Sequence, residues 1–190
     1  MLILVFEKSQ VNRILVDNLP KSSSITFHDL YEEYPEFDVD IQREQALLLQ
    51  HDIIILHHPL YWYSCPPLLK QWIDLVLEYN WAYGKSGNAL KDKIIFQTIT
   101  TGGTQENYCA EGKDRYTIPE LLEPFNQTAR VCKMDYLPPF VIHGTHKMSE
   151  SEAMQMSEQY NTLLNYIAQH GFDSEAKKSH YLNHWIQAKH

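Results

Sequence analysis

The chain has little cysteine and far fewer basic than acidic side chains. Its 190 residues contain three cysteines, Cys65, Cys109 and Cys132, which are widely spaced and odd in number. This pattern predicts neither a disulfide framework nor a zinc knuckle. The formal net charge of -8 argues against a general nucleic-acid binder, because such a protein needs basic surface to displace phosphate counterions.

Long apolar runs are also missing. No run approaches the roughly 18 residues of a membrane span, and the first ten residues lack the basic region and cleavage site of a signal peptide. We therefore expect a cytoplasmic protein. Its length predicts a single domain over residues 1–190, large enough to bury a core without metal or disulfide. Residues 171–190 read as a polar tail that packs on a neighbour or frays.

What the chain does contain is one distinctive stretch, residues 53–84. It opens with a short apolar run at residues 53–56, rich in β-branched side chains, as in the central strand of a parallel sheet. Pro59 ends this strand because proline cannot donate to a sheet ladder. Two interpretations of the aromatic residues that follow are open: they line a surface loop with a function, or they are core residues at the domain edge. The three rings are those of Tyr61, Trp62 and Tyr63, and the core interpretation concerns Trp62 and Tyr63.

The rest of the chain alternates strand and helix patterns. Strands are expected at residues 2–6, 25–30, 53–56, 94–99 and 134–143, the last interrupted by two prolines. Helical patterns lie between them, including one helix over 118–131 and a closing helix over 149–170. The alternation predicts an α/β three-layer sandwich with a five-stranded parallel sheet of order 2-1-3-4-5.

In that order the loops after strands 1, 3 and 4 meet in one crevice. The first loop leads into a helix whose free N–H groups would hold a phosphate. The second offers backbone amides and aromatic rings, and the third offers two hydroxyls and two glycines that let backbone approach a ligand. A planar phosphorylated ligand such as FMN fits all three, although the third loop alone is equally typical of an ordinary turn. The candidate residues are Ser9, Gln10, Val11, Asn12, Leu60, Tyr61, Trp62, Tyr63, Thr100, Thr101, Gly102 and Gly103.

A metal site is not expected. His57 and His58 are neighbours in a predicted strand, so their side chains point to opposite faces of the sheet and cannot share one ion.

The run HPLYWYSCPPLLKQWIDLVL, followed by WAYG and ITTGG, resembles the flavodoxin-like NAD(P)H:quinone oxidoreductases. Within that family it is most similar to the ancillary proteins of glutathione-regulated potassium-efflux systems. The resemblance implies a flavodoxin-like fold, FMN rather than FAD as cofactor, NAD(P)H as electron donor and a quinone as acceptor. It also implies that residues 9–12 bind the FMN phosphate and ribityl end, 60–63 the ring edge and 100–103 the pyrimidine side. Tyr108 falls where relatives have a tyrosine that assists hydride transfer.

Two features depart from the family pattern. Glu7, Lys8 and Ser9 follow Phe6 at once, so the phosphate loop is shorter than in relatives. Asp114 occupies the place, six residues after the tyrosine, where mammalian-type quinone reductases have a histidine.

Three functions are compatible with the sequence. The first is a two-electron quinone oxidoreductase with ping-pong kinetics, for which an apolar cleft of Tyr61, Trp62, Tyr83 and Tyr108 is expected. The second, implied by the resemblance alone, is a regulatory subunit docked on a potassium-efflux antiporter at the inner face of the cell membrane. The third is a one-electron carrier. The resemblance also implies a homodimer, with Trp81, Tyr83 and the tail as contacts.

Overall fold

The fold is built on one parallel sheet. The computed structural model describes residues 1–5 and 10–189. Along the sheet the strands run in the order β2-β1-β3-β4-β5, and β6 also pairs with β4. All the pairings are parallel, so the strands end at the same edge of the sheet. The strands are β1 (Leu2–Val5), β2 (Thr26–Asp29), β3 (Ile53–Pro59), β4 (Ile94–Thr100), β5 (Asp135–Tyr136) and β6 (Phe140–Ile142).

The prediction of five strands is wrong in one respect, because the described residues form six. The expected strand over 134–143 is divided into β5 and β6 at Pro138 and Pro139, which have no N–H to donate to the ladder. Both pieces pair with β4, as Ile94 lies opposite Asp135 and Thr98 lies opposite Phe140. The split strand therefore still brings its carboxyl end to the edge where β4 ends.

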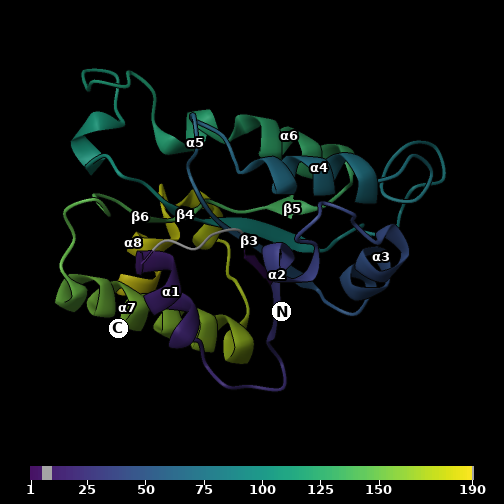
Figure 1. The fold of residues 1–190 in the computed structure, drawn as a ribbon, viewed down its shortest axis with the longest axis horizontal. Helices are drawn as coiled ribbons and strands as arrows, with labels where there is room; N and C mark the ends of the chain where they lie inside the picture. Colours follow the sequence, from purple (N-terminus) through teal and green to yellow (C-terminus); the bar gives the residue numbers. More distant parts are fainter. Residues whose placement is uncertain (6–9, 190) are drawn as a thin grey trace.

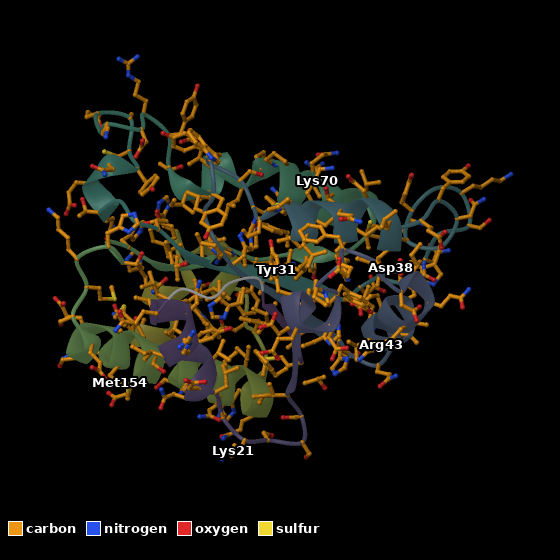
Figure 2. All side chains as sticks on the ribbon, viewed as in Figure 1. Lys21, Tyr31, Asp38, Arg43, Lys70 and Met154 are labelled. Carbon is orange, nitrogen blue, oxygen red and sulfur yellow. The ribbon has the colours of Figure 1, made fainter. Side chains whose placement is uncertain are left out.

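Helices cover both faces of the sheet (Figure 1). One layer contains α1 (Gln10–Asp17), α7 (Glu150–His170) and α8 (Leu182–Gln187). The other contains α3 (Ile41–Leu49), α4 (Pro67–Val76), α5 (Ile118–Leu121) and α6 (Glu123–Val131). Figure 2 shows Lys70 on α4 and Met154 on α7 on opposite sides of the sheet. A short α2 (Leu30–Glu33) follows β2, and two 3-10 helices, η1 (Gln105–Asn107) and η2 (Ala176–Lys178), lie in connections.

The single helix expected over 118–131 is two helices in the structure. It breaks at Leu122, and α6 has Pro124 in its first turn. Proline cannot supply the N–H that would continue α5 into α6.

Neighbouring histidines of β3 enter different layers. The His57 Nε2 lies 3.1 Å from Asn12 Oδ1, and its ring packs on Tyr160 of α7. The His58 ring packs on Phe125 of α6. Burial lowers the pKa of His57 to about 3 and the pKa of His58 to about 4. Both rings are therefore neutral core residues that point away from each other.

The described part of the tail packs on its own chain. Leu182, Trp185 and Ile186 are buried in the cluster beneath α7. The Trp185 Nε1–H donates to Asp173 Oδ1 over 2.9 Å, and the Leu182 N–H donates to Pro139 O over 2.9 Å. Across residues 1–5 and 10–189, no helix is both long enough and apolar enough to span a membrane.

Candidate functional site

Two adjoining hollows open at the carboxyl edge of the sheet. The larger has a volume of about 420 Å³ and is lined from α1 and from the loops after β3, β4 and β6. The smaller has a volume of about 300 Å³ and extends toward the segment after Gly103. Leu60, Gly102 and His146 line both hollows. The two spaces therefore adjoin at these three residues.

The helix α1 contributes its first turn to the larger hollow. Gln10 and Val11 line it, and the first N–H groups of a helix have no acceptor within the helix. Asn12, a predicted ligand residue, lines neither hollow, because its side chain is buried and bonds to His57. Ser9 and the shortened loop after Phe6 lie outside the described residues.

The loop after β3 carries its aromatic residues on a tight turn. The Ser64 N–H donates to Tyr61 O over 2.9 Å, and the two residues between have positive φ, 49° at Trp62 and 62° at Tyr63. Positive φ at both central positions is typical of a type I′ turn, which favours glycine and asparagine. The side chain of Trp62 is 93% exposed and that of Tyr63 is 50% exposed. The interpretation of these rings as core residues is therefore wrong.

The amides of this loop are not equivalent. The Leu60 N–H donates to Thr100 O over 2.9 Å and the Tyr61 N–H donates to Pro59 O over 3.1 Å, so both are committed within the protein. Among the described residues, the amides of Trp62 and Tyr63 have no acceptor. Of the four residues predicted to bind a ring edge, these two have backbone donors to offer.

The loop after β4 contains two glycines, Gly102 and Gly103, whose backbone is not covered by a side chain of their own. A Cβ on Gly102 would lie 2.1 Å from His146 Nε2, and a Cβ on Gly103 would lie 2.8 Å from Asn107 Nδ2. Among the described residues the Gly102 amide has no backbone acceptor, whereas the Gly103 amide interacts with the Tyr108 hydroxyl, which lowers the pKa of that phenol against the effect of burial. The Thr101 hydroxyl, in contrast, donates to Gly103 O over 2.8 Å. Thr100 lines the larger hollow. The loop therefore offers amides, while its Thr101 hydroxyl is already used.

Tyr108 lines the smaller hollow beside Gly103. Burial raises the pKa of its phenol, so the hydroxyl stays protonated at neutral pH and can donate a hydrogen bond. Asp114 lines the same hollow and accepts a hydrogen bond from the Tyr63 hydroxyl over 3.1 Å. This hydrogen bond raises the pKa of Tyr63.

The prediction that Tyr83 lines an apolar cleft with Tyr61, Trp62 and Tyr108 is wrong. Tyr83 lines a groove between α4 and α6 with Ile73 and Cys132, near the carboxyl ends of those helices. Helices that cross over a parallel sheet run antiparallel to its strands, so the ends of α4 and α6 lie at the opposite edge from the two hollows.

The sequence reasoning missed a fourth loop, the one after β6. Thr145, His146 and Met148 line the larger hollow, and the His146 ring lies against Gly102. Only strands 1, 3 and 4 were expected to send loops into the crevice. The signal was present, because the predicted strand over 134–143 is followed by Gly144, Thr145 and His146, a second glycine and threonine run after a strand. Its relevance depended on β6 lying directly beside β4.

Comparison with known proteins decides the family. A family model described as "Flavodoxin-like fold" matches residues 6–166. The chain belongs to this flavodoxin-like family. This confirms the predicted flavodoxin-like α/β fold with a parallel sheet.

Two curated proteins of the family are similar over most of their length. The chain is 42% identical over 161 residues to the uncharacterized NAD(P)H oxidoreductase YrkL of Bacillus subtilis, covering 85% of this chain and 91% of that protein. It is 39% identical over 158 residues to the glutathione-regulated potassium-efflux system ancillary protein KefG of Pectobacterium atrosepticum. That match covers 83% of this chain and 86% of that protein.

Two solved structures are also similar. General stress protein 14 from Treponema denticola, in complex with FMN, has a TM-score of 0.82 and 36% identity, covering 87% of this chain and 97% of that chain. An NADPH-quinone reductase from P. pentosaceus has a TM-score of 0.76 and 33% identity, covering 85% of this chain and 95% of that chain.

Proposed function

We propose that this protein is an FMN-dependent NAD(P)H:quinone oxidoreductase. The observation that carries the proposal is the set of free amides at the carboxyl edge of the sheet. Trp62, Tyr63, Gly102 and Gly103 line the smaller hollow, and the N–H groups of the first three have no backbone acceptor among the described residues, while that of Gly103 faces the Tyr108 hydroxyl. A flat heterocycle with acceptor atoms on its edge suits such a cradle. The FMN complex of the similar Treponema protein supports this ligand class.

Different residues would bind different parts of the cofactor. The first turn of α1, at Gln10 and Val11, would face the phosphate end. The Trp62 and Tyr63 amides would bind the ring edge, and the Gly102 and Gly103 amides the pyrimidine side, where they favour negative charge. Bound FMN would supply the ability to take a hydride from reduced nicotinamide and to pass two electrons to a quinone.

Tyr108 has a distinct role in this proposal. Its phenol stays protonated beside Gly103, so it would donate a hydrogen bond to the bound nicotinamide or quinone. The two substrates would stack in turn on the exposed face of the bound ring, beside Tyr108, which gives ping-pong kinetics. We further propose that the protein is a cytoplasmic homodimer.

The experiment is a titration of the purified protein with FMN, followed by an assay of menadione-dependent NADPH oxidation. We expect saturable quenching of flavin fluorescence and parallel lines in double-reciprocal plots. Gly102→Val fills the cradle, because a side chain there meets the His146 ring, and should abolish binding. Val131→Ala is the matched control on exposed α6. Failure of the wild-type protein to bind FMN contradicts the proposal.

A second candidate function has its own observation. The 39% identity to KefG over 83% of this chain supports a regulatory subunit of a potassium-efflux system. Such a subunit would bind at the inner face of the cell membrane through the antiporter, and redox activity would be optional. The test is co-sedimentation with vesicles that contain or lack the antiporter. Equal recovery with both kinds of vesicle contradicts this function, whatever the FMN titration shows.

A further inference from the structure

The loop after β4 is tied to the loop after β6 on both sides of Gly102. The Thr101 N–H donates to Ile142 O over 2.9 Å, and the Gly144 N–H donates to Gly103 O over 2.8 Å. Thr145 adds two bonds to Thr101 O, from its N–H over 3.0 Å and from its hydroxyl over 3.1 Å. The shape of residues 101–103 therefore depends on residues 142–145.

His143 adds a side-chain connection to these backbone bonds. Its Nδ1 lies 3.2 Å from the Thr101 hydroxyl oxygen. Its half-buried ring packs on Tyr108, with centroids 5.7 Å apart, and on Tyr181, with centroids 5.9 Å apart. One imidazole therefore contacts both the β4 loop and the tyrosine of the smaller hollow.

The hydrogen bonds determine which nitrogen of His143 carries the proton. The Thr101 hydroxyl has one hydrogen, and it is donated to Gly103 O, which can only accept. Thr101 must then accept from His143, so the proton is on Nδ1. The Nε2 atom gives the same answer: it is buried and has no partner among the described residues. A lone pair there costs less than a buried N–H without an acceptor.

We propose that His143, as the neutral Nδ1–H tautomer, is a positioning residue that holds residues 101–103 and Tyr108 in ligand-binding geometry. The contacts of His143 with Thr101 and Tyr108, here called the clamp, belong to this chain alone. The effect of the clamp on FMN binding rests on the proposed function. Burial lowers the pKa of His143 to about 4, against the opposing charge of Glu106, which keeps the ring neutral at pH 7.

The first test needs no ligand. A long-range ¹H–¹⁵N spectrum of the full chain at pH 7 reports which nitrogen of each histidine is protonated. We expect His143 to show a protonated Nδ1 and an unprotonated Nε2. A proton on Nε2, with or without one on Nδ1, overturns the proposal.

The second test compares two substitutions by FMN titration. His143→Phe keeps a ring but removes the donor, and should weaken FMN binding about tenfold, the usual effect of one lost hydrogen bond. His143→Asn keeps an N–H near the position of Nδ1, and should restore most of the affinity. His170→Phe, at an exposed histidine that ends α7, is the matched control.

The outcomes separate the two proposals. Wild-type affinity in His143→Phe, or equal losses in His143→Phe and His143→Asn, overturns the positioning role. If the wild-type protein binds no FMN, the proposed function and the ligand part of this inference both fail, and the spectrum alone decides whether the clamp exists.

Discussion

At the scale of single residues, the site departs from what local preference favours. Trp62 and Tyr63 occupy left-handed backbone positions where bulky residues are strained by about 1–3 kcal/mol each. The sequence allowed the prediction that these rings lie on a functional loop. It could not show that the Leu60 and Tyr61 amides are already bonded, because the Leu60 bond depends on the register between β3 and β4.

The strain at the turn gives the first prediction. Trp62→Gly should leave the free energy of unfolding unchanged or raise it by up to about 1 kcal/mol, because glycine adopts positive φ without a steric penalty. The Trp62 side chain lines the smaller hollow, so the loss of its ring should weaken FMN binding by up to about tenfold. Urea unfolding and flavin fluorescence measure the two effects. Tyr116→Gly, at an exposed residue outside the positive-φ region, should not stabilise the protein. A destabilised Trp62→Gly variant would contradict the interpretation.

A second residue-scale prediction concerns the buried carboxylate of Glu44. Burial raises the pKa of Glu44, but hydrogen bonds from His28, Tyr34 and Trp72 outweigh this effect and lower it. Glu44→Leu would leave three buried groups without their acceptor.

We expect Glu44→Leu to reduce the free energy of unfolding by about 3–5 kcal/mol in urea. The exposed Glu33 pairs with Arg43, and Glu33→Leu should cost at most about 1 kcal/mol. Similar losses in the two variants would show that the buried network contributes little.

At the scale of elements, the sequence predicted the strands and helices that have strong hydrophobic periodicity. It failed where proline divides an element, as at β5 and β6 and at α5 and α6. It also missed the loop after β6, because the contacts between residues 101–103 and 142–145 join segments about 40 positions apart. The role of the tail could not be decided from its polar composition, although its buried face is formed by Leu182, Trp185 and Ile186.

The tail gives the element-scale prediction. Trp185→Ala should lower the free energy of unfolding by about 3–5 kcal/mol, because the ring is buried against Phe172 and Tyr166. Trp62→Ala, the same truncation at an exposed ring, should change it by no more than about 0.5 kcal/mol. Denaturant unfolding of both variants measures the difference. A small loss in Trp185→Ala would mean that α8 adds little to the core.

At the scale of the whole molecule, buried neutral histidines set the response to acid. The folded pKa values of His57 and His58, about 3 and about 4, lie below the ordinary value of 6.5. Between pH 6.5 and these folded pKa values, the unfolded chain therefore binds protons on both histidines that the folded chain does not bind. Stability from these groups is fully present above pH 6.5 and is lost as the pH falls toward the folded values.

Below pH 6, each histidine should make the free energy of unfolding fall by about 1.4 kcal/mol per pH unit. His57→Leu removes one of these protons and should reduce the slope by about 1.4 kcal/mol per pH unit. Urea unfolding between pH 4 and 7 measures the slope. His170→Leu, at an exposed histidine, should leave the slope unchanged. An unchanged slope in His57→Leu would show that His57 is not held neutral in the folded state.

We propose that free backbone amides at the carboxyl edge of the sheet hold a flat phosphorylated cofactor. The most direct measurement is a ¹H–¹⁵N amide spectrum of the protein with and without FMN. The account predicts that the largest shifts are those of Trp62, Tyr63, Gly102 and Gly103. No shifts at these amides, or shifts centred on the groove between α4 and α6, would contradict it.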